Sequence, residues 1–566
     1  MMNLAYCLNT AWMWKCRLES RAFRRATRAV AETQTALLRS MLRENEATAF
    51  GERHKFGSIG DPRQYQKRVP LSTFEDYSDS IERIAAGTPN VLTRRRVELL
   101  EPTSGTTRGE KLIPYTRSLR EQFQRGVAAW VADLMAHRPA VRRGRAYWSV
   151  SPCLGTGRRT AGGIPVGFDD DTAYLGRSER FVANRLLAVP SSVARLPDVA
   201  AFRYVTLLHL VRAWDLALIS IWNPTFLSTL LAQLDPWQER LCSDIRAGTV
   251  SLPEAAAQPG RFRPDVRRSL RLESILRADA PPAEKLRRIW PRLALISCWA
   301  DGPAEWGVPE VRSLFPSVEI QPKGLIATEA FVSFPSVGRP GAALALRSHF
   351  FEFQEVPSGA LRLAHELERG GRYRVVVTTG GGLYRYELRD EIKVVEFEHR
   401  CPLLRFLGKA DCVSDLVGEK LGEPHVRRVL DRIFSSAGFS PGFALLVPVE
   451  DKPPRYRLYL EGLPGESPPG LAASLERLLE DGLQENPYYR YAVSLGQLAP
   501  VEVEPLDRTQ EPGRVIYERR CVALGQKLGD VKPAALDPRP GWAEAFGTAA
   551  GVKRRPPIKT HHAPFS

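Results

Sequence analysis

The pattern of apolar positions predicts an α/β fold. Apolar residues recur with a helical period over residues 17–50, which predicts one or two amphipathic helices. Residues 201–235 predict a helix, a strand (LALISIW), a turn at Asn223-Pro224 and a second helix. Short β-rich runs dominate residues 291–400, among them LALISCW, AALALRSHFFEF, GRYRVVVTT and IKVVEFEH. This alternation predicts a large N-terminal domain with several β-sheets flanked by helices.

A change of pattern near residue 408 predicts a second, smaller domain. The run Gly408-Lys409-Ala410-Asp411 interrupts the strands, residues 416–436 return to a helical pattern, and strands then alternate with a helix at 470–484. We therefore expect a large domain over 1–407, a hinge at 408–411 and a small, mobile α+β domain over 412–537. The Pro- and Arg-rich segment 538–566 is expected to be poorly ordered. We find no internal repeat.

Composition and charge indicate a globular protein and do not favour a nucleic-acid partner. The 566 residues are 43% hydrophobic and 25% charged, as in globular proteins. The net charge of +16 raises the question of an anionic partner, but the short basic runs are not interleaved with aromatic residues, so we expect no nucleic-acid partner. The 14 lysines are few beside 66 arginines, so a lysine inside a motif is informative. This excess of arginine over lysine resembles the coding bias of a GC-rich, bacterial genome.

The chain is expected to be cytoplasmic, with no membrane partner. Its longest uncharged run, residues 216–234, contains several polar residues and is better explained as a strand and a helix than as a membrane span. The N-terminus lacks the pattern of a secretory signal, and the eight cysteines form neither a C-x-x-C pair nor a zinc-spaced cluster. The pattern leaves the oligomeric state unknown.

The segment from Glu101 to Lys111 (EPTSGTTRGEK) is the most informative in the chain. A strand that runs into a loop of hydroxyl residues and glycines, with a lysine at its end, exposes backbone N–H groups, hydroxyls and positive charge together, which suits a phosphate group. The spacing does not fit the P-loop pattern G-x-x-x-x-G-K-[ST]. Taken alone, the segment is equally compatible with a Ser/Thr-rich turn that binds nothing.

Three segments together resemble the adenylate-forming enzymes. Thr103 to Lys111 match that superfamily's phosphate loop, [ST]-S-G-[ST]-[ST]-x-G-x-x-K; residues 325–329 (LIATE) resemble its second motif and residues 382–390 (GLYRYELRD) its third. The GLYRY wording, the FFEF run at 350–353, NPYY at 486–489 and GDVKP at 529–533 are similar to the auxin-responsive acyl-acid amido synthetases, the Gretchen Hagen family. The resemblance extends to about Asp537.

The resemblance implies a role for each motif residue. The phosphate loop would contact ATP through Thr103, Ser104, Gly105, Thr106, Thr107, Gly109 and Lys111. Glu329 would hold Mg²⁺ on the triphosphate, since a carboxylate is a hard oxygen ligand. The other nucleotide-binding residues would be Thr328, Phe350, Tyr384, Asp390 and Lys409, with Asp390 accepting both ribose hydroxyls and Lys409 at the pivot between the two domains.

Lys532, which precedes a proline, resembles the family's catalytic lysine. A cation held at the α-phosphate, where charge gathers in the transition state, contributes roughly 3 to 4 kcal/mol. Lys527 is the alternative, and either lysine is also compatible with a solvated loop.

The chain departs from the superfamily at three places. Leu325 stands where many members have an aromatic residue that stacks on adenine, a role that Phe350 could take over, and Arg389 stands where glycine usually precedes the aspartate. Arg108 adds bulk to the phosphate loop. The apolar stretch 207–226 could contribute to an acyl pocket, although core packing explains it equally well.

The resemblance implies an ATP-dependent ligase that adenylates a carboxylic acid, releasing pyrophosphate, and transfers the acyl group to an amine such as an amino acid. Two alternatives stay open: transfer to the thiol of coenzyme A or of a carrier protein, and a nucleotide-binding homologue without turnover. The identities of the acid and of the acceptor depend on pocket shape, which no short motif reveals.

Overall fold

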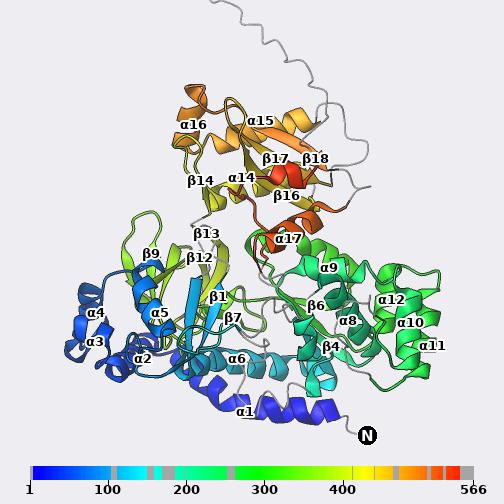
Figure 1. Ribbon diagram of the computed structural model, residues 1–566, viewed down its shortest axis with the longest axis horizontal. Helices are drawn as coiled ribbons and strands as arrows, with labels where there is room; N and C mark the ends of the chain where they lie inside the picture. Colours follow the sequence, from blue (N-terminus) through cyan, green and yellow to red (C-terminus); the bar gives the residue numbers. More distant parts are fainter. Residues whose placement is uncertain are drawn as a thin grey trace, which may run out of the picture. The chain divides into compact units, whose positions relative to one another are not determined.

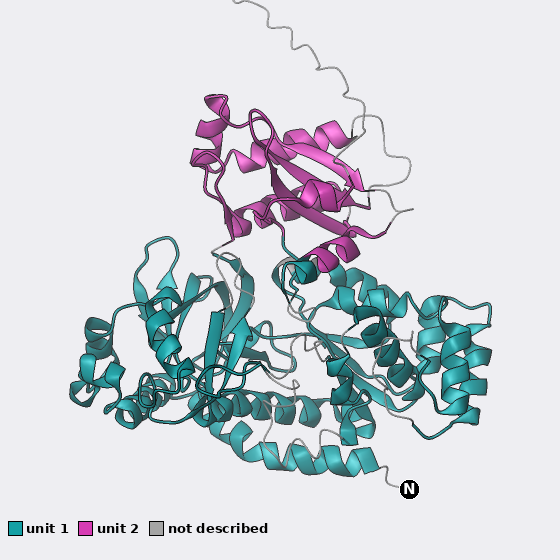
Figure 2. Cartoon of the chain, in the orientation of Figure 1, with its two compact units in different colours: residues 1–411, 521–534 teal, residues 412–520, 535–566 magenta. Residues whose placement is uncertain are grey.

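The structure is a computed structural model that describes residues 4–103, 111–149, 158–167, 185–196, 198–251, 262–410, 412–438, 440–462, 471–506, 511–526 and 531–547 (Figure 1). Its contacts divide the chain into two compact units: unit 1 contains residues 1–411 and 521–534, and unit 2 contains 412–520 and 535–566 (Figure 2). The division after residue 411 lies at the end of the predicted hinge. Residues 521–534, expected in the small domain, belong instead to unit 1.

A four-stranded parallel sheet forms one half of unit 1. Its order is β3-β4-β5-β6, with β3 at Arg145–Trp148, β4 at Leu216–Ser220, β5 at Leu295–Cys298 and β6 at Glu319–Pro322. β4 and β5 are buried on both faces, as is usual for parallel strands covered by helices. The covering helices are α8 (Val199–Arg212), α9 (Pro224–Leu231), α10 (Gln238–Ala247), α11 (Val266–Leu276), α12 (Pro282–Ile289) and α13 (Val308–Leu314).

The helix–strand–turn–helix pattern predicted for residues 201–235 is confirmed by α8, β4 and α9. The predicted turn caps the second helix, because the Asn223 side chain accepts a hydrogen bond of 3.0 Å from the Thr225 backbone N–H and Pro224 occupies the first helical turn. The uncharged run 216–234 is therefore a buried strand followed by a helix.

A seven-stranded antiparallel sheet forms the other half of unit 1. Its order is β10-β9-β11-β12-β13-β8-β7. The strands are β7 (Ser333–Pro335), β8 (Ala342–Leu344), β9 (Phe350–Glu355), β10 (Leu361–Leu363), β11 (Arg372–Thr378), β12 (Tyr386–Glu398) and β13 (Cys401–Lys409). A separate hairpin of β1 (Val97–Thr103) and β2 (Lys111–Thr116) belongs to the same hydrophobic core. Gly408 and Lys409 are the last residues of β13, so the first half of the predicted hinge is strand.

The N-terminal helices pack on these sheets. α1 (Leu4–Ala26) and α6 (Arg117–His137) lie side by side (Figure 1) and share the main core of unit 1 with the antiparallel sheet. α2 (Val30–Asn45), α3 (Ala49–Arg53), α4 (Pro62–Arg68) and α5 (Ser78–Ala85) follow. The pair α1 and α2 confirms the amphipathic helices predicted within 17–50, although α1 begins earlier because its apolar stripe already includes Ala5 and Met13.

Unit 2 is a small α+β unit. The strands β16 (Phe443–Val449) and β17 (Arg455–Glu461) are antiparallel, and β18 (Glu502–Leu506) is parallel to β17. The other elements are the short pair β14 (Val413–Ser414) and β15 (Leu421–Gly422), and the helices α14 (Glu423–Ser436), α15 (Leu471–Leu483), α16 (Pro487–Ser494), α17 (Gly513–Ala523, which ends in unit 1) and α18 (Trp542–Ala545).

The segment after residue 537, expected to be poorly ordered, begins with packed residues. Trp542 and Phe546 are buried, and the Trp542 ring stacks on Tyr517 with 5.2 Å between ring centroids. These aromatic contacts hold residues 538–547 within unit 2. The basic composition of the segment did not predict this packing, because Trp542 and Phe546 contact residues that are distant in the sequence.

Candidate active site

The hairpin β1–β2 brings the two ends of the predicted phosphate loop together. Thr103 and Lys111 are direct cross-strand partners, so the residues between them connect adjacent antiparallel strands. The Lys111 ammonium lies 5.6 Å above the ring of Phe74. The predicted loop residues that fall outside the described part of the chain are Ser104, Gly105, Thr106, Thr107 and Gly109.

Asp390 and Lys409 face each other on neighbouring strands. They are cross-strand partners in β12 and β13, and the Lys409 ammonium lies 3.1 Å from Asp390 Oδ1 and 3.3 Å from the Leu388 carbonyl. The Asp390 side chain is 1% exposed, whereas that of Lys409 is 38% exposed. Within the described residues, neither carboxylate oxygen of Asp390 accepts a hydrogen bond. Because buried carboxylates normally use several acceptor positions, Asp390 retains capacity for a ligand that donates hydrogen bonds.

The second motif follows β6 and is tied to the β1–β2 hairpin. The Tyr115 hydroxyl, on β2, donates a hydrogen bond to the Thr328 carbonyl. A tight turn with a 2.9 Å hydrogen bond from the Ala327 N–H to the Ala330 carbonyl carries Thr328 and Glu329 at its tip. The hairpin therefore fixes the backbone beside Glu329.

Glu329 lies within electrostatic range of three other predicted site residues. Burial raises the pKa of Glu329 above its usual range, Lys409 and Lys111 oppose that shift, and Asp390 adds to it. The structure thus brings Glu329 within electrostatic range of Lys111 and Asp390, from the other two motifs, and of Lys409, from the predicted hinge. Two carboxylates and two ammonium groups at one place can bind a ligand that carries both phosphates and hydroxyls.

Phe350 and Tyr384, which were predicted to bind the nucleotide, have side chains enclosed by protein. Their side chains are 1% and 0% exposed and belong to a hydrophobic cluster beneath α2 and α4. The Tyr384 ring stacks on Phe50 with 4.7 Å between centroids, and its hydroxyl donates to the Leu92 carbonyl. Phe350 packs against the edge of Tyr65. Because both rings are enclosed by protein, neither offers a face to adenine.

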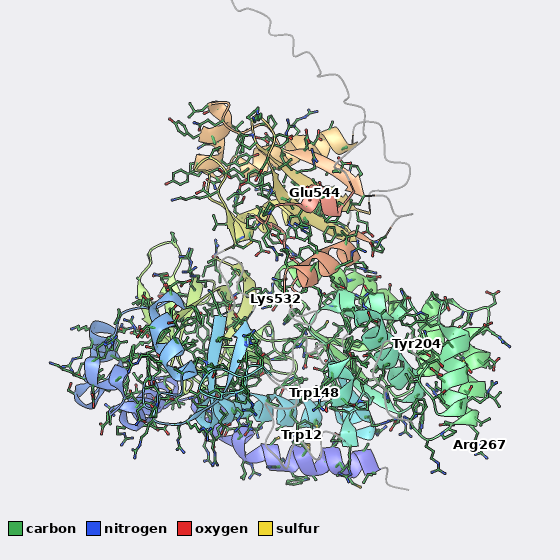
Figure 3. All side chains as sticks on the ribbon, viewed as in Figure 1. Trp12, Trp148, Tyr204, Arg267, Lys532 and Glu544 are labelled. Carbon is green, nitrogen blue, oxygen red and sulfur yellow. The ribbon has the colours of Figure 1, made fainter. Side chains whose placement is uncertain are left out.

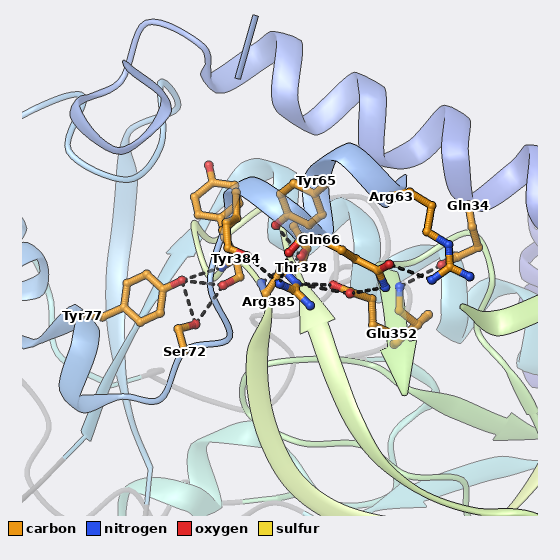
Figure 4. Close-up of polar contacts among 12 residues, drawn as sticks. Gln34, Arg63, Tyr65, Gln66, Ser72, Tyr77, Glu352, Thr378, Tyr384 and Arg385 are labelled. Atoms are coloured by element: carbon orange, nitrogen blue, oxygen red, sulfur yellow. Dashed lines mark hydrogen bonds and ion pairs between the residues drawn. The ribbon is translucent and has the colours of Figure 1, made fainter. Parts of the chain in front are cut away.

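The GLYRY motif instead builds a buried polar network (Figure 4). The Arg385 Nε donates to both carboxylate oxygens of Glu352, at 3.2 and 3.0 Å, and the two side chains are 3% and 1% exposed. The same guanidinium donates to the carbonyls of Gln66 and Val69, at 2.8 and 2.5 Å. The Arg385 backbone N–H donates to Thr378 Oγ1. The motif therefore anchors the turn before β12, the strand that carries Asp390.

Arg389 shows why glycine is usual at its position. Its φ of +58° lies in the left-handed region that favours glycine. Its carbonyl accepts a hydrogen bond of 2.7 Å from the Ala410 N–H, which ties the two strands together beyond Asp390 and Lys409. The exposed arginine side chain adds positive charge beside the site.

Lys532 belongs to unit 1, unlike the domain that the sequence predicted for it. Lys532 is labelled in Figure 3. Its ammonium lies 5.0 Å above the ring of Trp299, which directly follows β5. The alternative lysine, Lys527, falls outside the described residues. The structure therefore places Lys532 at the carboxyl end of the parallel sheet.

Sequence analysis missed a short repeat that shapes this edge. Residues 216–222 (LALISIW) and 293–299 (LALISCW) differ at a single position, and their strands β4 and β5 are parallel neighbours. The Trp299 N–H donates to the Trp222 carbonyl at 2.8 Å, and the two rings lie 5.4 Å apart. The near-identity of the two heptads was the available signal. It predicts two tryptophans side by side beyond a parallel sheet, where ligands bind in α/β folds.

Neither a cluster of metal-ligating side chains nor a membrane-spanning helix occurs in the described part of the chain. The described residues contain no group of three or more His, Cys, Asp and Glu side chains arranged to hold a metal. No helix among them combines the length and the apolar character that crossing a bilayer requires.

Two family models match the chain. The GH3 family N-terminal domain matches residues 19–320, and the GH3 family central domain matches residues 342–409. The second match includes the Asp390–Lys409 pair, and the first includes the β1–β2 hairpin.

Relatives and solved structures that match the chain also carry the GH3 name. The chain is 25% identical over 426 residues to the indole-3-acetic acid-amido synthetase GH3.15 of Arabidopsis thaliana, covering 70% of this chain and 71% of that protein. It is 27% identical over 469 residues to the probable indole-3-acetic acid-amido synthetase GH3.12 of Oryza sativa subsp. japonica, covering 72% and 74%. The structure of AtGH3.15 acyl acid amido synthetase in complex with 2,4-DB matches with a TM-score of 0.79 at 19% identity, over 94% of this chain and 96% of that one. This likeness establishes the fold.

Proposed function

The chain belongs to the GH3 family, and from this premise we propose that it is an ATP-dependent acyl-acid amido synthetase. In the first step, a carboxylate oxygen of the acid attacks the α-phosphorus of ATP, the bond to pyrophosphate breaks, and an acyl-adenylate forms. In the second step, an amine nitrogen attacks the acyl carbon, AMP leaves, and the amine loses a proton. Splitting one difficult condensation into two easier displacements is the general advantage of such an intermediate.

The buried Asp390 carboxylate is the observation that supports this proposal most directly. An acceptor that is 1% exposed and has unused oxygens suits a pair of ribose hydroxyls, which both donate hydrogen bonds. The neighbouring ammonium of Lys409, 3.1 Å from Asp390 Oδ1, would face the phosphates. Lys111, at the end of the β1–β2 loop, would add a second positive charge to the triphosphate site.

Glu329 fits the role of a magnesium ligand. Magnesium on a nucleotide is commonly held by one or two carboxylates together with the phosphates, so a cluster of three acidic residues is not required. When bound, the ion would neutralise charge on the phosphates and on the departing pyrophosphate. The raised pKa of Glu329 reflects a carboxylate poorly solvated by water, which a cation would stabilise.

We assign the α-phosphate to Lys532. Its ammonium is fixed above Trp299 at the carboxyl end of the parallel sheet, and a cation placed there can stabilise the charge that develops when two anions meet. We place the activity in a reducing cytoplasm, in keeping with the free thiols of the seven described cysteines. The partners we propose are a small carboxylic acid and an amino acid.

Acid-dependent exchange of labelled pyrophosphate into ATP tests the first step. A panel of aryl, indolyl and fatty acids should reveal at least one acid that supports exchange, and Glu329→Gln and Lys532→Ala should remove or strongly reduce it. Lys67→Ala, at an exposed lysine on α4, is the matched control and should leave exchange intact. Absence of ATP binding by the parent protein would refute the proposal.

The second step is tested by the acceptor. With an acid that supports exchange, amino acids should release AMP and yield an amide. Release of AMP by coenzyme A alone would instead show a thioester-forming ligase.

A further inference from the structure

The carboxyl edge of the parallel sheet carries an unusual set of side chains. Trp148 ends β3, Trp222 and Trp299 follow β4 and β5, and Lys323 follows β6. Trp130, from α6, lies beside Trp148 with 6.2 Å between ring centroids. Four strands and one helix therefore bring aromatic surface and a lysine to the edge where α/β sheets bind ligands.

Lys323 lies among these rings rather than among carboxylates. Its ammonium donates a 2.7 Å hydrogen bond to Ser220 Oγ and lies 5.0 Å from the ring centroid of Trp222 and 5.6 Å from that of Trp130. Within the described residues, no acidic side chain forms an ion pair with it. An ammonium in apolar surroundings without a counter-charge is costly to maintain. Such a group is well prepared to bind an anion.

The electrostatic surroundings of Lys323 agree with this geometry. Burial lowers its pKa from 10.5 to about 8, and the titratable neighbour on β5 is the Cys298 thiol. Burial raises the pKa of that thiol to about 12, so Cys298 stays neutral wherever Lys323 changes charge. The ammonium is thus present at neutral pH and is lost in the mildly alkaline range.

A second lysine shares the same aromatic surface. Lys532 lies above Trp299, and Trp299 contacts Trp222, over which Lys323 lies. All these residues belong to unit 1. If Lys532 serves the α-phosphate, the attacking carboxylate must come to the same pair of tryptophans.

We propose that Lys323 binds the carboxylate of the acid substrate and that the rings of Trp130 and Trp222 flank the planar, apolar body of that acid. This inference rests on the proposed function and adds to it the residue that recognises the carboxylate of the acid. The ring faces give apolar contact area, and the lysine supplies the one charge that distinguishes an acid from its neutral analogues.

The test compares Lys323→Met with Lys323→Arg and the parent protein. In pyrophosphate exchange, Lys323→Met should raise the KM for an aromatic acid on the order of 10- to 100-fold, the loss of a hydrogen bond to a charged group, and leave the KM for ATP unchanged. Lys323→Arg should recover part of the affinity, and Lys67→Met should match the parent. An unchanged acid KM in Lys323→Met would overturn the inference, as would a rise only in the KM for the amino acid.

Two further readouts complement these variants: the first needs only the parent protein, and the second needs no turnover. The acid KM of the parent should rise as the pH passes about 8, where the Lys323 ammonium is lost, and a flat profile would contradict the inference. In equilibrium binding, the parent should prefer benzoate to benzamide, and Lys323→Met should lose this preference. If no acid supports exchange but benzoate binds through Lys323, the proposed function fails while the anion site stands. If an acid supports exchange but the parent protein does not prefer benzoate to benzamide, the proposed function stands and the anion site at Lys323 fails.

Discussion

Replacing Arg385 by methionine should destabilise unit 1 severely. The substitution removes a guanidinium that donates to the Glu352 carboxylate and to the carbonyls of Gln66 and Val69, all in the interior. Glu352 would keep only the 2.9 Å hydrogen bond from Gln66 Nε2 and would remain 1% exposed. Breaking a buried ion pair from one side costs about 3 to 5 kcal/mol, because the remaining charge is uncompensated. Methionine has a Cβ like arginine, so the strain of the positive φ at residue 385 is the same in both proteins.

The assay is urea unfolding followed by tryptophan fluorescence. Ten of the eleven tryptophans lie in unit 1 and only Trp542 lies in unit 2, so the signal reports mainly on the unit that carries the substitution. Arg246→Met is the matched control, since Arg246 pairs with Glu273 at a largely exposed position of unit 1 and such pairs contribute about 0 to 1 kcal/mol.

The double variant Glu352→Gln with Arg385→Met separates charge from packing. The glutamine is neutral and can still accept from Gln66, so the double variant should be more stable than Arg385→Met alone. If Arg385→Met costs no more than Arg246→Met, the network in Figure 4 does not hold the GLYRY turn in place.

Three further predictions concern the site. Asp390→Asn should raise the KM for ATP on the order of tenfold or more without changing the KM for the acid, because a charge-assisted acceptor is lost; an unchanged ATP KM in the exchange assay would rule out the ribose role. Arg389→Gly should stabilise unit 1 by up to about 1 kcal/mol relative to Arg389→Ala, which keeps the strained Cβ; urea midpoints compare the two, and a less stable glycine variant would refute the strain. The pKa of Lys323 is about 8 in the folded protein and 10.5 in the unfolded chain, so the unfolded chain binds more protons between pH 8 and pH 10.5, and the free energy of unfolding should rise over that range by up to about 3 kcal/mol. Unfolding measured as a function of pH should show no such rise in Lys323→Met.

Local pattern was sufficient to predict most of the fold. The period of the apolar residues located α8, β4 and α9, and the β-rich runs located β9, β11 and β12. These elements are long, regular and specified by their own residues. The assignment of residues 521–534 to unit 1 was not predictable in this way, because it depends on contacts with distant parts of the chain.

The site was predicted unevenly for the same reason. Asp390 and Lys409 were each singled out by a resemblance, but their pairing across one hairpin was not predicted. The burial of Tyr384 was not predicted, because a motif shows the order of residues along the chain but not which of them are enclosed by protein. Lys323 was missed because its two aromatic partners, Trp130 and Trp222, lie far from it and from each other in the chain.

The two near-identical heptads also bear on how this chain reaches its native topology. β4 and β5 present almost the same side chains, so the sheet gains nearly the same contact energy whichever of them occupies either position. When two neighbouring strands fit either position in a sheet equally well, both strand orders compete during folding. Most sequences avoid this competition because each strand has distinct side chains. The order must then be decided outside the strands, by the differing helices that precede them and by the right-handed crossovers that those helices make. In this family member, the connecting helices rather than the strands distinguish the native sheet from a sheet in which β4 and β5 have exchanged positions.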